Sequence, residues 1–304
     1  MLAKNGMVMT YFMLLFASVV WGFQPVPIKW ILTEWSPVTI SAVRYMIISA
    51  VMALIVYPRE KGHFLPKGIA LVWLACMGVT GILLNNVLQF TGLRETTVIN
   101  CTLISATTPA VTALMAVFII RERLNLFSWL GIFISFCGVL VVVSNGSWEM
   151  IRSIDFHRGD VYCILSQVCW AAYSFFGLKL MRKKSVLWVT LWAGFFGGLM
   201  SLTYGLVTND FHVPLLSPVP LASFLYMLIF GGLLSGYFYN VGVKKAGPSL
   251  AAIFMNIMPV VGMISGYIIL NEELGIIRIA GAGAIFVGVY LTTHGHELAA
   301  KVGR

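Results

Sequence analysis

Charged residues are scarce in this sequence, and apolar residues take their place. Asp, Glu, Lys and Arg make up only 10% of the 304 residues, whereas 59% are hydrophobic. The mean hydropathy is +0.91. A soluble globular protein needs far more polar surface than this composition supplies. The composition therefore excludes a soluble domain and predicts an all-α integral membrane protein.

Groups that carry catalysis or ion coupling are also missing from the apolar segments. No Asp or Glu lies in the middle of an apolar run, so the sequence shows no acidic relay for coupling to protons or sodium. The histidines fall in connections or in the C-terminal tail: His63, His157, His212, His294 and His296. Without a nucleophile–base pair or a metal constellation in the helices, a membrane-embedded enzyme has no support.

The cysteines give no sign of disulfides or of a metal site. All of them lie inside apolar runs and none has metal-ligand spacing: Cys76, Cys101, Cys137, Cys163 and Cys169. We interpret them as small packing residues, and we expect neither a metal nor a cofactor.

The apolar runs are long enough to cross a membrane. About 20 residues span about 30 Å of hydrocarbon as a helix. Ten such runs are predicted, over 8–32, 37–57, 68–90, 97–120, 125–144, 159–180, 186–207, 221–243, 248–270 and 276–293.

The basic residues indicate orientation rather than nucleic-acid binding, because the net charge of +9 is spread over short connections and forms no aromatic-laced face. With the N-terminus inside, the inner segments hold 14 of them: Lys4, Arg59, Lys61, Lys67, Arg121, Arg123, Lys179, Arg182, Lys183, Lys184, Lys244, Lys245, Lys301 and Arg304. The outer segments hold five: Lys29, Arg94, Arg152, Arg158 and Arg278. This asymmetry predicts that both termini are cytoplasmic.

The two halves of the chain repeat each other at a spacing of 150 residues. The matching pairs are Gly81/Gly231, Gly92/Gly242, Pro109/Pro259, Glu122/Glu272, Leu124/Leu274, Gly131/Gly281 and Gly138/Gly288. Residues 1–146 form the first predicted repeat, 147–158 an outer linker, and 159–304 the second repeat with a short tail. Five spans per half would orient the repeats oppositely, as in alternating-access carriers.

Prolines interrupt several predicted spans. Pro109 and Pro259 would free the carbonyls of Ser105 and Met255, and Pro25 and Pro27 would bend the first span. Breaks at matching places in two repeats point to a midplane binding or gating site. A kink without ligand contact is the alternative.

Polar and aromatic residues form stripes on several predicted helices. Since such groups are costly in hydrocarbon, we expect them to face one wet cavity and bind the solute, although interhelical hydrogen bonding explains each one singly. The candidates are Trp21, Gln24, Asn85, Gln89, Ser105, Thr108, Trp170, Tyr173, Ser235, Tyr239 and Asn256.

Three charged residues within or beside the spans are interpreted as structural. Arg44 is expected to pair with Glu34 and helix-end carbonyls near the outer mouth, and contact with an anionic solute group is the alternative. Glu122 and Glu272 are expected to cap helix N-termini or pair with nearby arginines, and gating is the alternative.

Several motifs together resemble the EamA domain of the drug/metabolite transporter superfamily. The first half carries Trp21-Gly22, Ser36-Pro37, Arg44, Pro109, Glu122-Arg123-Leu124, Gly131 and Gly138, and the second carries Trp170, Pro259, Glu272-Glu273-Leu274, Gly281 and Gly288. The resemblance covers almost the whole chain. It implies ten helices in two inverted five-helix repeats, and a carrier that exports or exchanges amino acids, related metabolites or drugs across a bacterial inner membrane.

The expected function is alternating-access transport of a small neutral or zwitterionic organic solute. A passive channel, or a carrier of phosphorylated or nucleotide-linked metabolites, is the alternative. The expected partners are the solute and membrane lipid, without nucleic acid. The sequence leaves open whether the protein is a monomer or a homodimer.

Overall fold

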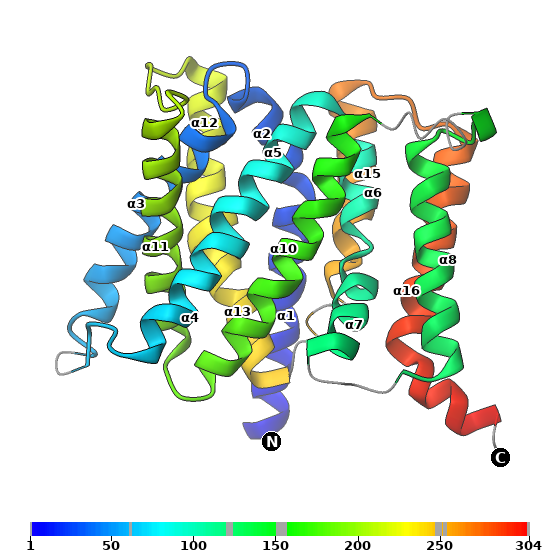
Figure 1. Cartoon of the computed structure of the whole chain (residues 1–304), viewed down its shortest axis with the longest axis horizontal. Helices are drawn as coiled ribbons and strands as arrows, with labels where there is room; N and C mark the ends of the chain where they lie inside the picture. The colour runs from blue at the N-terminus through cyan, green and yellow to red at the C-terminus, as the bar shows by residue number, and fades with distance from the viewer. Residues whose placement is uncertain are drawn as a thin grey trace.

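The chain folds into a bundle of helices. The computed structural model describes residues 2–60, 63–119, 124–149, 157–246, 251 and 254–302. No β-strand occurs in these residues. Figure 1 shows the helices packed roughly side by side, with both termini at the same end of the molecule.

The elements follow one another in this order: α1 (Leu2–Phe23), α2 (Pro25–Ile31), α3 (Pro37–Val56), α4 (Ile69–Met77), η1 (Gly78–Leu84), α5 (Asn85–Glu95), α6 (Val98–Ser105), α7 (Thr108–Ile119), α8 (Leu126–Val143), α10 (Arg158–Met181), α11 (Val186–Val207), α12 (Pro218–Tyr226), η2 (Met227–Leu234), α13 (Ser235–Ala246), α15 (Ile257–Leu270) and α16 (Ile276–Val302).

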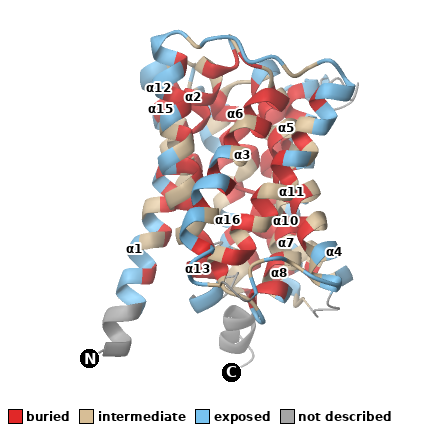
Figure 2. Cartoon of the chain, turned by 90° about the vertical axis from the view of Figure 1, so that its left-hand side faces the viewer, coloured by how far each residue is buried: buried red, intermediate tan, exposed pale blue. Residues whose placement is uncertain are grey.

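The helices have the length and composition of membrane spans. Within the described residues, eight helical segments are long and apolar enough to cross a bilayer. Met7–Phe23 and Pro25–Ile31, which meet at a 40° bend, reach this length and hydropathy only when they are taken together, and α15 is a shorter apolar helix of 14 residues. Figure 2 shows exposed residues along the outer faces and buried residues between the helices. The exposed residues include many large hydrophobic side chains, as expected for a surface that faces lipid.

Short polar side chains begin several of these helices. Ser36, Thr97, Asn125 and Ser185 each accept a hydrogen bond from a backbone N–H three residues later. Such caps satisfy amides that have no partner within the helix. These caps also place the first residue of each helix where its apolar run begins.

The helix interruptions lie where the prolines are. α1 ends one residue before Gln24, and α2 begins at Pro25. α6 ends at Ser105 and α7 begins at Thr108, while a turn at Asn256 precedes α15. Proline lacks the N–H that would continue the helical bonding. The freed carbonyl of Ser105 lies 2.6 Å from the Thr108 hydroxyl, whose single proton is shared between this carbonyl and Gln167 Oε1 at 2.7 Å.

Two π-helical segments, η1 and η2, were not expected from the sequence. They lie at matching places in the two halves, and each contains a glycine of the 150-residue repeat, Gly81 or Gly231. A π-helix widens the helical turn and is often found at functional sites. Side chains bond to both segments: Asn86 Nδ2 donates to Gly81 O at 3.3 Å, and Trp21 Nε1 donates to Gly231 O at 2.7 Å.

Glycines bring α8 and α16 into close antiparallel contact. A Cβ atom added at Gly131 would lie 2.5 Å from Gly288 O, and one added at Gly138 would lie 2.9 Å from Gly281 O. Side chains at these positions would separate the helices. Small residues allow such approach in lipid, where packing contacts hold helices together.

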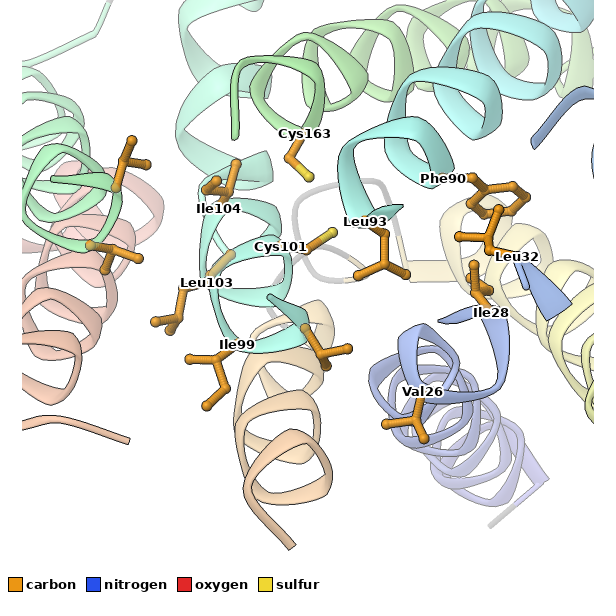
Figure 3. Packing of buried hydrophobic residues seen from close by; sticks show 14 of the residues in the cluster. Val26, Ile28, Leu32, Phe90, Leu93, Ile99, Cys101, Leu103, Ile104 and Cys163 are labelled. Atoms are coloured by element: carbon orange, nitrogen blue, oxygen red, sulfur yellow. The ribbon is translucent and has the colours of Figure 1, made fainter. Parts of the chain in front are cut away.

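A buried apolar cluster surrounds α2, the end of α5 and the start of α6. Figure 3 shows part of this cluster, including Val26, Leu93, Ile99 and Ile104. In Figure 1, α2 lies at the end of the molecule opposite the termini. The cluster therefore fills the bundle at that end.

Candidate functional site: a central cavity

A central cavity lies between helices of both halves of the chain. Its empty volume is about 1210 Å³, part of it open to solvent. The lining residues come from α1, α2, α3, η1, α5, α6, α7, α10, α11, η2, α13, α15 and Met255. Binding sites for small molecules are commonly concave and combine apolar walls with a few polar groups.

Four aromatic side chains form one side of the cavity. Trp21 contacts Trp170 and Tyr239, with ring centroids 5.8 Å and 5.3 Å apart. Trp170 also stacks on Tyr173, with centroids 5.1 Å apart. These rings come from α1, α10 and α13. Together they present broad apolar faces against which a flat or apolar group can pack.

Amides and hydroxyls also line the cavity. Gln167 connects α10 to the broken α6–α7 span, because its Oε1 accepts from the Thr108 hydroxyl at 2.7 Å and its Nε2 donates to Ser105 Oγ at 3.2 Å. Asn85 Nδ2 donates to Ser166 O at 2.8 Å. Thus Asn85, Ser105 and Thr108 line the cavity and also hold the helices together.

Arg44 differs from its expected structural role. Its side chain lines the cavity and is only 2% exposed, yet Nε and Nη1 have no hydrogen-bond partner. The expected pairing with Glu34 is absent, since the Glu34 carboxylate accepts hydrogen bonds from the backbone N–H and hydroxyl of Ser217. The loop before α12 holds Glu34 at the end of the bundle, which leaves the guanidinium within the cavity without a counter-ion from that residue.

Glu272 caps a helix, which was one of the roles expected for it. Its carboxylate accepts hydrogen bonds from Val98 N at 2.8 Å and Ile99 N at 2.9 Å, at the start of α6. It also pairs with Lys29 at 3.2 Å rather than with an arginine. One side chain thus connects α2, α6 and the segment after α15. Glu122, its partner in the repeat, lies outside the described residues.

The structure brings most of the predicted solute-binding residues to the cavity. Trp21, Gln24, Asn85, Gln89, Ser105, Thr108, Trp170, Tyr173 and Tyr239 all line it, together with Pro25. Ser235 and Asn256 are not among the lining residues, and neither are Pro27, Pro109 and Pro259. The three prolines therefore act on the backbone and not as part of the wall.

Sequence reasoning missed several polar residues of the wall, namely Tyr45, Asn86, Gln167, Thr190 and Asn240. Asn86 and Asn240 each follow a predicted residue by one position, and Gln167 precedes Trp170 by three. The sequence signal that could have identified them is a polar residue inside an apolar run. The sequence does not show the rotation of each helix, which decides whether that residue faces the cavity.

A model of the EamA-like transporter family matches residues 8–144 and residues 157–294. The chain belongs to the EamA-like transporter family. An EamA relative, the uncharacterized transporter YyaM of Bacillus subtilis, is 30% identical over 292 residues, which cover 94% of this chain and 93% of YyaM. An uncharacterized transporter of Archaeoglobus fulgidus is 25% identical over 284 residues, covering 93% of this chain and 97% of the relative.

A solved crystal structure shares the fold of this EamA protein. It aligns with a TM-score of 0.69 and 14% sequence identity, over 98% of this chain and 99% of the other. The family and the names of its relatives identify the protein as a membrane transporter. Within the described residues, no group of three or more His, Cys, Asp or Glu side chains gathers as a metal site would require.

Proposed function

We propose that this protein is an alternating-access carrier for small neutral or zwitterionic organic solutes, such as amino acids, related metabolites or drugs. The observation that carries the proposal is the central cavity, whose wall combines aromatic rings with amides and hydroxyls. Packed side chains at the end opposite the termini and a cavity partly open to solvent suit one state of such a carrier.

The proposed architecture is two inverted repeats of five spans each, over residues 1–146 and 159–304, joined by an outer linker at 147–158. Three features support it: the family model matches both halves, η1 and η2 occupy equivalent places, and the breaks at Ala106 and Asn256 are 150 residues apart.

Helix packing gives the repeats a further common feature. α8 and α16 are equivalent in the repeat, and they pack antiparallel through pairs of equivalent glycines. A two-fold axis in the membrane plane would relate helices in this way. Both termini at one end of the bundle accord with an even total of spans, and the positions of the basic residues favour a cytoplasmic location for that end in a bacterial inner membrane.

Transport by purified protein in liposomes tests the proposal. Uptake of at least one solute from a panel of amino acids, nucleosides and amphipathic amines should saturate at carrier rates. Trp170→Ala should reduce this uptake at least about tenfold, because it removes the ring that touches three other cavity aromatics. Trp129→Ala provides the matched control, because Trp129 is 45% exposed on α8 and does not line the cavity.

Asn85→Ala should also impair uptake, and folded protein should still be recovered for each variant. Single-channel currents in planar bilayers that correspond to a flux far above carrier turnover would instead favour a passive channel. Preferential uptake of phosphorylated or nucleotide-linked compounds would favour the other alternative. Failure of the whole panel to cross the membrane would count against the proposal.

A further inference from the structure

Arg44 is the feature of the cavity that hydrogen bonding within the protein does not explain. The side chain is almost fully buried on α3, in the middle of a 20-residue apolar helix. Burying a cation without a partner costs several kcal/mol, even after the surroundings relax. A site that bears this cost is expected to gain from binding an anion.

The acidic side chains at the end of the bundle near α2 have other partners. Glu34 binds Ser217, and Glu272 binds Lys29 and the start of α6. Asp160 accepts a hydrogen bond from the Thr96 hydroxyl at 2.6 Å. Among the described residues, no carboxylate lies within the 4.0 Å that would make an ion pair with Arg44.

Neutral groups around Arg44 orient it but do not neutralise it. The guanidinium carbon lies 5.2 Å from the centroid of the Tyr45 ring, which favours a cation without removing its charge. The Gly231 carbonyl on η2 already accepts the Trp21 indole N–H. A Cβ atom at Gly231 would lie 3.5 Å from Arg44 Nη2, and one at Gly232 would lie 3.4 Å from Nε. The guanidinium therefore lies in ordinary contact distance of these two positions, and the tight approach at Gly231 is that of Gln24 Oε1, 2.3 Å from where a Cβ atom would be.

Gln24 adds a second unsatisfied polar group at the same place. Its Oε1 is buried and has no partner, and it lies against Gly231 as Arg44 does. Trp21 is three residues away in the chain and begins the aromatic side of the cavity. Among the cavity-lining residues in the described part of the chain, Arg44 is thus the one basic side chain, and it lies beside Gly231, whose carbonyl bonds to Trp21.

We propose that the transported solute carries a carboxylate, which binds Arg44, and an aromatic or aliphatic body, which packs on Trp21, Trp170 and Tyr239. A planar guanidinium binds a carboxylate through two parallel hydrogen bonds. One cation matches a monoanionic group. A phosphate dianion would call for more positive charge. This inference rests on the proposed function. A zwitterionic amino acid carries such a carboxylate and fits the proposed function, whereas a simple organic acid would extend the proposed solutes to monoanions.

Four probes that share one ring distinguish these chemistries: phenylacetate, phenylalanine, phenylethylamine and phenylacetamide. Their binding to the full-length protein in detergent can be measured by tryptophan fluorescence and by thermal shift, without any transport step. We expect the two carboxylates to bind at least about tenfold more tightly than the neutral amide. Phenylacetate binding more tightly than phenylalanine would assign the site to organic acids, and the reverse order would assign it to amino acids.

Arg44→Gln should lower the affinity for the carboxylates at least about tenfold and leave that for phenylacetamide unchanged, whereas Arg44→Lys should retain part of the preference. The proposal would be overturned if the wild type bound carboxylates and phenylacetamide with equal affinity. It would also be overturned if Arg44→Gln kept the wild-type preference for carboxylates. The absence of any carboxylate binding would likewise overturn it. If Arg44→Gln does not fold, the ratio of carboxylate to amide affinity in the wild type and in Arg44→Lys still tests the proposal.

The same measurements separate this inference from the proposed function. Carboxylate-selective binding without uptake in liposomes would contradict the carrier proposal and leave the Arg44 site standing. Uptake of neutral solutes that carboxylates do not inhibit would support the carrier and contradict the Arg44 site.

Discussion

Glu272 provides a direct test of the proposed closure at the end of the bundle opposite the termini. Its carboxylate accepts two backbone N–H groups of α6 and the Lys29 ammonium, at 2.8, 2.9 and 3.2 Å. The side chain is only 9% exposed, so these bonds are weakly screened. Glu272→Ala removes all three contacts and leaves the start of α6 without this cap.

The magnitude follows from the kinds of bonds lost. Hydrogen bonds to a charged group contribute ~1.5 to 3 kcal/mol each, and loss of a helix cap costs about 1 kcal/mol. Lys29 is 29% exposed and its ion pair adds little. Water replaces part of these hydrogen bonds when the helices separate. We therefore expect Glu272→Ala to destabilise the closed conformation, relative to the open one, by about 2 kcal/mol. This corresponds to an about 30-fold shift toward opening at this end.

Cys101 reports such opening, because it lines the cavity and is only 1% exposed. In a variant that keeps Cys101 as its sole cysteine, a membrane-impermeant thiol reagent added at this face should label Cys101 about 30-fold faster after Glu272→Ala. The matched control is Glu273→Ala, because Glu273 is the sequence neighbour of Glu272 and is exposed. An unchanged labelling rate in Glu272→Ala, or equal acceleration in both variants, would refute the role of Glu272 in closure.

Two further predictions concern stability. Gly131→Leu should destabilise the protein by about 3 kcal/mol or more, because its Cβ atom would lie 2.5 Å from a carbonyl oxygen of α16; Gly283→Leu, on the open side of α16, should change the unfolding midpoint little. Trp21→Phe should cost ~1 to 3 kcal/mol, because the buried Gly231 carbonyl loses its 2.7 Å partner. Trp129→Phe on the lipid face should not, and denaturation in detergent followed by circular dichroism checks both pairs.

Local features of the sequence predicted much of the fold. Apolar runs of sufficient length predicted most of the spans, because hydrocarbon thickness sets helix length. Pro25 and Pro109 predicted breaks, because proline cannot donate the next helical hydrogen bond. The repeat spacing paired Gly131 with Gly281 and Gly138 with Gly288, and in the structure Gly131 packs against Gly288 and Gly138 against Gly281. The apolar composition and motif order predicted the family, which the family match confirms.

The candidate site was only partly predictable, because a polar stripe does not reveal which way its helix is turned. Asn85 faces the cavity, but Ser235, its equivalent in the repeat, does not line it. Asn86 and Gln167 line the cavity and were missed. The π-helical turns η1 and η2 change the direction of the following residues, and no local signal distinguishes a π-helical turn from an α-helical one.

Sequence alone determined that this chain lies in a membrane, where its helices begin and break, and that its halves repeat. These properties depend on hydrophobicity, chain length and the chemistry of single residues. Tertiary structure decided the state of the charges: Glu272 meets Lys29 and α6, and Arg44 is left in the cavity without a carboxylate among the described residues. The reason is that pairing depends on distances between segments remote in the chain, which only the packed helices set.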